Sequence, residues 1–130
     1  MDCMKIIFVD AINGLIRENG TVFNEMQELL DTYPNRKIVL TGANDEQFKM
    51  FHLDKSPYEV FTLKHDPEKT DIRYWQILLQ TYDVKPEDTI YFEHNVQAAE
   101  VAKSVGIPTY FYDHIKEDLV ALKHFIDANL

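Results

Sequence analysis

The sequence predicts an α/β protein in which a five-stranded, mostly parallel sheet lies between two layers of helices. Short runs rich in β-branched and aromatic residues alternate with stretches of helical spacing along the whole chain. Strands separated by helices of about ten residues are typical of βαβ units, and right-handed crossovers then place helices on both faces of the sheet. The chain has 130 residues, close to the commonest domain size, so we expect a single domain over residues 1–130.

The expected strands are short apolar runs bounded by charged or turn-forming residues. They span residues 5–10, 36–42, 58–63, 88–93 and 108–113. The expected helices carry apolar residues at helical spacing, and they span residues 24–33, 44–53, 66–83, 95–106 and 117–129. Asn24 is the expected N-cap of the first helix, and Gly106 is expected to end the fourth.

A β-hairpin is expected over residues 14–23, between the first strand and the first helix. Asn19 and Gly20 lie between two apolar-flanked arms of this segment. Asn-Gly is the strongest short hairpin signal, because a type I′ turn needs positive φ at both of its central residues. The hairpin would stand beside the end of the first strand.

The charge balance and the single cysteine exclude several classes of protein. Thirteen basic residues face 22 acidic ones, a net charge of −9, which disfavours nucleic acid as a partner because phosphate backbones are bound by basic patches. No apolar run is long enough to cross a membrane, and the first residues lack the pattern of a signal peptide. Cys3 has no second cysteine to pair with, which agrees with a cytoplasmic location.

Polar residues follow the expected strands at the positions where those strands end. Parallel α/β sheets bind ligands outside the carboxyl ends of their strands, so these residues are the first candidates for a functional site. An ionised carboxylate at the end of a buried strand is costly unless it is paired, which makes Asp10 the most informative of them. The strand-end residues are Asp10, Thr41, Gly42, Glu93, His94 and Asp113.

The order and spacing of four short motifs resemble the haloacid dehalogenase superfamily, which consists mostly of phosphohydrolases with an aspartate nucleophile. The first strand ends in "DAINGL", the second in "IVLTG", and a lysine precedes "VKPED" and the fourth strand. The segment "FEHNVQAAEVAKSVG" matches the fourth motif, an acidic strand end followed by a helix and a glycine. The resemblance covers nearly the whole chain and implies a Rossmann-like core without a cap domain.

The resemblance also implies roles for individual residues. Asp10 would attack phosphorus and form an aspartyl-phosphate, while Thr41 and Lys69 would bind the oxygens of the transferred group and neutralise developing charge. Gly42, Asn13 and Asn95 are further candidates for ligand binding. Gly42 follows Thr41, Asn13 replaces a glycine of the first motif, and Asn95 falls where true dehalogenases carry an asparagine.

A magnesium ion is the cofactor that the resemblance implies. In the family it bridges the nucleophile, a backbone carbonyl of the first motif and an acidic residue of the fourth. The corresponding groups here are the Asp10 carboxylate and the Ile12 carbonyl, but His94 stands at the usual position of the acidic ligand. Mg²⁺ takes oxygen ligands and disfavours imidazole, so Glu93, one residue earlier, is the alternative ligand.

The first motif departs from the family at the position that moves protons. The family's general acid and base is an aspartate two residues after the nucleophile, and Ile12 occupies that place. An isoleucine carries no proton, and general acid–base catalysis typically contributes about 10² to 10⁴ in rate. We therefore expect weak or altered phosphohydrolase activity if the protein is an enzyme.

Two other functions agree with the same residues. The domain could bind a small phosphorylated ligand or a protein partner without catalysis. A metal-free displacement at carbon is the third hypothesis, because true dehalogenases replace the second aspartate by an aromatic residue and read "DAYGT", which "DAINGL" resembles. Those enzymes close a cap over the substrate, and the segments between Asp10, Thr41 and Lys69 are too short for one.

Overall fold

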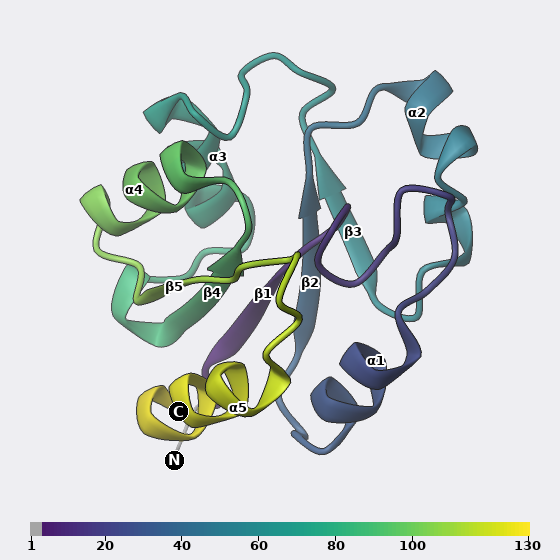
Figure 1. Ribbon diagram of the computed structural model, residues 1–130. Coiled ribbons are helices and arrows are strands. Elements are labelled where there is room, and N and C mark those ends of the chain that lie inside the picture. Colours follow the sequence, from purple (N-terminus) through teal and green to yellow (C-terminus); the bar gives the residue numbers. More distant parts are fainter. Residues whose placement is uncertain (1–3) are drawn as a thin grey trace.

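The predicted three-layer α/β/α fold is confirmed by a computed structural model, which describes residues 4–130 (Figure 1). All four strand pairings are parallel, and the strands lie in the order β3-β2-β1-β4-β5. The first strand therefore lies at the centre of the sheet. The strands are β1 (Ile6–Asp10), β2 (Lys37–Thr41), β3 (Glu59–Thr62), β4 (Thr89–Glu93) and β5 (Thr109–Phe111).

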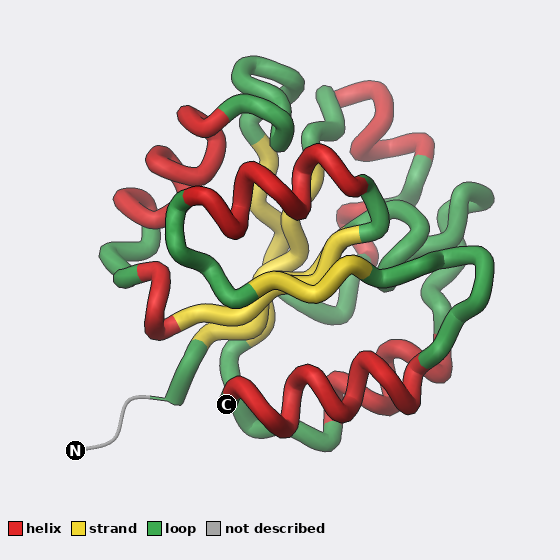
Figure 2. The backbone as a smooth tube through the Cα atoms, turned by 60° about the vertical axis from the view of Figure 1, so that its left-hand side comes forward, coloured by secondary structure: helices red, strands yellow, loops and turns green. Residues whose placement is uncertain are grey.

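Helices cover both faces of this sheet (Figure 2). The helices are α1 (Asn24–Asp31), α2 (Asp45–Met50), α3 (Ile72–Thr81), α4 (Val96–Ser104) and α5 (Leu119–Asn129), with short 3₁₀ turns at η1 (Leu53–Lys55) and η2 (Pro86–Asp88). α1 and α5 bury apolar side chains against one face, which includes Ile7 and Val9 of the central strand. α3 and α4 cover the opposite face, where Phe8 lies. The alternation of β1 side chains thus joins both halves of the core.

The largest boundary difference from the sequence-based predictions is at the start of the third helix, and the cap predicted for the first helix also differs. The third helix begins at Ile72 rather than at residue 66, because Asp71 caps it by accepting a hydrogen bond from the Arg73 N–H (2.9 Å). The segment before it, with Lys69, is an irregular loop. In α1 the N-cap is Phe23, which makes no side-chain capping bond, so the prediction that Asn24 caps this helix is wrong.

The segment after β1 contains a tight turn of a different type from the one predicted. Gly20 has φ 85°, but Asn19 is not in the positive-φ region, so the turn is not type I′. The Asn19 side chain instead accepts hydrogen bonds from the Thr21 N–H (3.1 Å) and hydroxyl (2.6 Å). A single antiparallel bridge between Ile16 and Val22 joins the two arms.

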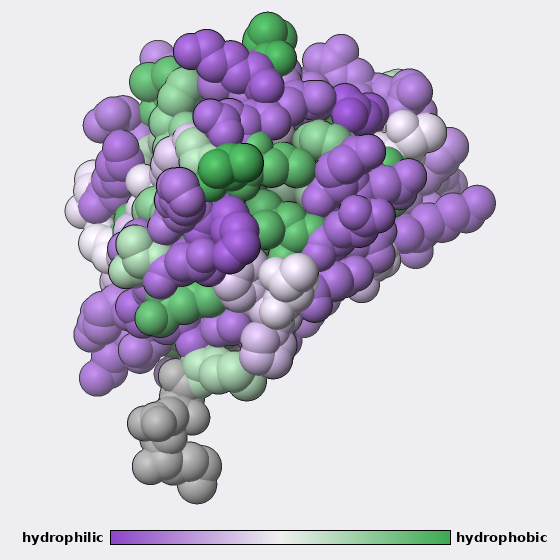
Figure 3. Space-filling model, turned by 60° about the horizontal axis from the view of Figure 1, so that its bottom comes forward, coloured by the Kyte–Doolittle hydropathy of each residue, from purple (hydrophilic) through white to green (hydrophobic). Residues whose placement is uncertain are grey.

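The face shown in Figure 3 is mostly hydrophilic, with hydrophobic residues exposed near the centre of the view and in smaller groups elsewhere. Among the described residues, no helix has the length and apolar character needed to cross a bilayer. The prediction that the chain has no internal disulfide concerns Cys3, and this residue lies outside the described residues.

Candidate functional site at the carboxyl edge of the sheet

The ends of β1, β2 and β4 and the flanking loops line a pocket of about 320 Å³. Because the strands are parallel, Asp10 of β1 and Glu93 of β4 reach the same edge of the sheet. Both carboxylates are almost completely buried, each with 1% exposure. Thr41, Lys69 and His94 also line the pocket. The structure thus brings together the nucleophile, hydroxyl and lysine positions that the sequence predicted.

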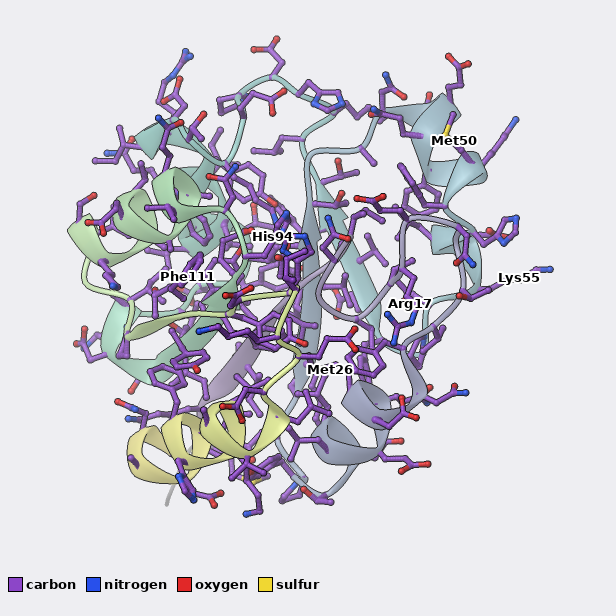
Figure 4. All side chains as sticks on the ribbon, viewed as in Figure 1. Arg17, Met26, Met50, Lys55, His94 and Phe111 are labelled. Carbon is purple, nitrogen blue, oxygen red and sulfur yellow. The ribbon has the colours of Figure 1, made fainter. Side chains whose placement is uncertain are left out.

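Both carboxylate oxygens of Asp10 accept hydrogen bonds. The Lys69 ammonium donates to Oδ1 (3.0 Å). The backbone N–H of His94 (3.0 Å) and its imidazole Nδ1 (2.5 Å) both contact Oδ2. In Figure 4 the His94 side chain lies near the centre of the view, close to the end of β1. Asp10 is therefore held between a lysine and a histidine that come from different loops.

Helix α3 fixes the loop that carries Lys69. The indole N–H of Trp75 donates to the Lys69 carbonyl (2.8 Å), and the buried Trp75 ring packs against Tyr91 with centroids 5.0 Å apart. The neighbouring Tyr74 donates its hydroxyl to the Thr41 carbonyl (3.0 Å). The aromatic face that packs α3 on the sheet therefore also positions the lysine and the end of β2.

Glu93 is the second buried carboxylate of the site. Lys69 donates to its Oε1 (3.0 Å), and the Tyr91 hydroxyl donates to the same oxygen. The backbone N–H of Asn95 donates to Oε2 (3.0 Å), and His94 Nδ1 lies 3.2 Å from that oxygen. Lys69 and His94 thus each contact both carboxylates.

Burial and these contacts determine the charge states. Burial and the charge of Glu93 raise the pKa of Asp10, against the lowering effect of Lys69 and His94. Burial also acts to raise the pKa of Glu93, but Lys69 and three hydrogen-bond partners outweigh it and lower that pKa below its usual range. Burial lowers the pKa of Lys69, and the attraction of both carboxylates reverses this and raises it. Lys69 therefore contacts two carboxyl groups of unequal acidity, because the pKa of Glu93 is lowered and that of Asp10 is raised.

Stability should depend on pH through His94. Burial lowers the pKa of its imidazole, but hydrogen bonds to Asp10 and Glu93 and their charges raise it from 6.5 to about 10. The pKa of His94 in the folded protein lies above its ordinary value. The imidazolium therefore stabilises the folded state fully below about pH 6.5, and this contribution to the free energy of unfolding disappears as the pH rises through about 10. We expect the difference in unfolding free energy between the native chain and His94→Gln to shrink over that range in urea titrations. A difference independent of pH would contradict this assignment.

Further hydrogen-bond donors line the same pocket as Asp10. The Thr41 hydroxyl oxygen accepts from the Ala43 N–H (3.1 Å), which leaves its own hydrogen available. Within residues 4–130 the backbone N–H groups of Ile12 and Gly42 donate no hydrogen bond, and both residues line the pocket. Such a set of N–H and O–H donors suits an anion with several oxygens.

Three of the predicted positions lie differently. Asn13 adopts φ 69°, donates its amide to Glu18 (3.2 Å) and lines a neighbouring pocket. Asn95 lines the main pocket, but its side chain caps α4 by accepting from the Ala98 N–H (3.0 Å). Asp113 does not line the pocket, and its carboxylate accepts from the Ile115 N–H (3.0 Å).

The rim contains residues that sequence reasoning did not identify. His65, which no sequence motif indicated, lines the pocket and contacts Glu68 (2.5 Å) and Gln47. The spacing of Gln47, His65 and Glu68 along the sequence matches no recognisable motif.

Tyr91, a buried partner of Glu93, could have been identified from the sequence. It lies two residues before Glu93, and side chains two apart share a face of a strand.

Asp10, Glu93 and His94 are the residues that could hold a metal. Each offers one ligand atom, and these atoms lie within 4.8 Å of one another. The Ile12 carbonyl, the ligand expected from the first motif, accepts no hydrogen bond within the described chain. The set nevertheless fits Mg²⁺ poorly, because one donor is an imidazole nitrogen and both carboxylates already contact Lys69 and His94.

Comparisons with known proteins agree with the fold. No protein-family model matches the sequence, and no curated protein matches it. A haloacid dehalogenase family enzyme from Bacteroides thetaiotaomicron is similar in structure, with 14% identity, a TM-score of 0.71, and coverage of 93% of this chain and 98% of that one. The same enzyme is known in complex with magnesium and inorganic phosphate.

Two further structures are similar over most of their length. A haloacid dehalogenase superfamily hydrolase from Ehrlichia chaffeensis has 10% identity and a TM-score of 0.61, with coverage of 95% of this chain and 100% of that one. An uncharacterised protein from Corynebacterium glutamicum has 12% identity and a TM-score of 0.66, with coverage of 96% of each chain. The chain therefore shares its fold with haloacid dehalogenase family proteins of known structure.

Proposed function

We propose that the pocket binds the phosphoryl group of a small phosphorylated ligand. The observation that carries this proposal is the set of donors that line one pocket with Asp10: the Lys69 ammonium, the Thr41 hydroxyl, and the N–H groups of Ile12 and Gly42, which donate no hydrogen bond within residues 4–130. Hydrogen bonds from charged or preorganised donors to a phosphate oxygen are among the strongest in proteins. The similar enzyme known with inorganic phosphate supports the same ligand class.

Binding without efficient turnover is the function that this geometry favours. Ile12 offers no proton to a leaving group, and both oxygens of Asp10 already accept hydrogen bonds. A nucleophile held in this way is less reactive, and the missing acid alone is worth about 10² to 10⁴ in rate.

The binding test is thermal unfolding with inorganic phosphate. A ligand at about 100 times its Kd should stabilise the fold by roughly 2.7 kcal/mol. We expect phosphate to raise Tm, and Thr41→Val to weaken binding about tenfold through the loss of one hydrogen bond to a charged group. Thr81→Val is the matched control, because its exposed hydroxyl bonds only to the Ile77 carbonyl. If no phosphoanion raises Tm, the ligand proposal fails and a scaffold that binds a protein remains.

Slow hydrolysis is the second candidate, and the position of Asp10 in the pocket favours it. The carboxylate would attack phosphorus, the ester oxygen would leave with the electron pair, and water would then hydrolyse the aspartyl-phosphate. Without an acid, only leaving groups that need no proton should depart readily. We expect turnover of acetyl phosphate and aryl phosphates but not of alkyl phosphates, and its loss in Asp10→Asn.

The outcome with Asp10→Asn separates the two candidates. Equal background rates in both proteins would make Asp10 a binding group. Halide release from a 2-haloacid in excess chelator would instead favour displacement at carbon, for which the pocket is poorly suited because exposed residues such as Glu68 and Thr70 leave its rim open to water.

A further inference from the structure

His94 lies where the family resemblance expects an acidic metal ligand, and its ring bridges the two buried carboxylates. Nδ1 is 2.5 Å from Asp10 Oδ2 and 3.2 Å from Glu93 Oε2. A metal held by the same three residues would need an unprotonated nitrogen and free lone pairs directed at one point. The geometry is instead that of an N–H group shared between two acceptors.

The charges of the site balance without an added ion. When both carboxyl groups are ionised, Asp10 and Glu93 place two negative charges in a buried setting, and Lys69 contacts both but supplies only one positive charge. An uncompensated buried charge costs several kcal/mol. An imidazolium at His94 supplies the second positive charge, and a divalent cation beside it would leave an excess of two.

The outer edge of the His94 ring is available to a ligand. Its Nε2 makes no hydrogen bond within residues 4–130, and the side chain is 25% exposed and lines the pocket. Its ring meets His114 edge to face at 5.0 Å, which limits its rotation. One N–H therefore serves the carboxylates while the other is free to meet a phosphate oxygen.

We propose that the His94 side chain takes the place of the divalent cation in this pocket, so that the site binds phosphoanions without metal. The replacement of the cation by His94 concerns only the protein and can be tested with a cation alone. The binding of phosphoanions without metal rests on the proposed function.

The first experiment adds Mg²⁺ without phosphate and measures Tm. The native chain should shift by less than about 1 °C at roughly 100-fold excess of cation, because binding that stabilises the fold must raise Tm. His94→Asp restores a carboxylate and removes the imidazole, so its Tm should rise by several degrees with Mg²⁺. His94→Asn is the matched control, since it lacks the imidazole and adds no charge, and should gain less.

A second measurement covers the case in which His94→Asp does not fold. Mn²⁺ added to the native chain should leave the amide NMR signals of His94 and Asn95 unbroadened at sub-millimolar concentration. Selective broadening of these signals, or a rise in native Tm with Mg²⁺ or Zn²⁺ that His94→Asn abolishes, would overturn the proposal.

Phosphate added in excess chelator then distinguishes the two proposals. A rise in Tm supports both. Binding of phosphate that requires Mg²⁺ would overturn the replacement of the cation and leave the phosphate site intact. No response to phosphate, together with no response to Mg²⁺, would refute the phosphate site and leave His94 in the place of the cation.

Discussion

Replacement of Lys69 by methionine is expected to lower the free energy of unfolding by about 3–5 kcal/mol at neutral pH, the usual cost of removing one partner from a buried ion pair. The Lys69 side chain is only 14% exposed and contacts Asp10 and Glu93, each at 3.0 Å. Methionine keeps most of the length of the chain but leaves two buried carboxylates with one cation between them. Urea unfolding monitored by circular dichroism measures the change.

Lys64→Met is the control for this prediction. Lys64 pairs with Asp45 at 3.0 Å, but both side chains are largely exposed. Exposed pairs are worth about 0–1 kcal/mol, so this variant should unfold nearly like the native chain. An equally small effect of Lys69→Met would show that the carboxylates do not depend on the lysine, and the proposed charge balance would be wrong.

Gly14→Ala is expected to destabilise the fold by about 3 kcal/mol, at the upper end of the usual range for overpacking. A Cβ at Gly14 would lie 2.3 Å from the Asp10 carbonyl oxygen. That oxygen belongs to the main chain of the central strand and also accepts from the Leu15 N–H (3.0 Å), so it cannot move aside without distorting the turn after the nucleophile position. Thermal and urea unfolding would measure the loss.

Gly42→Ala serves as the comparison on the other side of the pocket. Its added Cβ would meet His65 Nδ1 at 3.3 Å, the end of an exposed side chain that can shift. We expect a change within about 1 kcal/mol, since the neighbour is not backbone. Similar losses in both variants would mean that the close approach at Gly14 does not govern the turn.

The fold and the centre of the site were predictable because they follow from the ends of parallel strands. Once β1, β2 and β4 are recognised, Asp10, Thr41 and Glu93 must reach one edge of the sheet. Their chemistry then follows from residue type. The motifs added Lys69, whose contact with Asp10 depends on a loop that no periodicity describes.

The remaining features depend on local backbone geometry that the sequence pattern does not encode. The positive φ of Asn13 accompanies a hydrogen bond from its side-chain amide to Glu18 rather than a place in the main pocket. The early start predicted for the third helix missed the cap at Asp71, and with it the loop that presents Lys69. The role of His94 required three-dimensional contacts, since a histidine at a strand end is compatible with structure, metal binding or charge compensation.

The protonation state of the His94 ring tests the central claim most directly, because an anion site without metal requires a cationic imidazole between Asp10 and Glu93. Side-chain ¹⁵N NMR in excess chelator, followed from neutral pH to alkaline pH, would measure it. We expect both ring nitrogens to carry hydrogen at pH values where an ordinary histidine is neutral, and to lose one only near the raised pKa of about 10. A ring that is neutral near pH 8, with a bare Nδ1 that shifts when Mg²⁺ is added, would contradict this interpretation and identify a metal site.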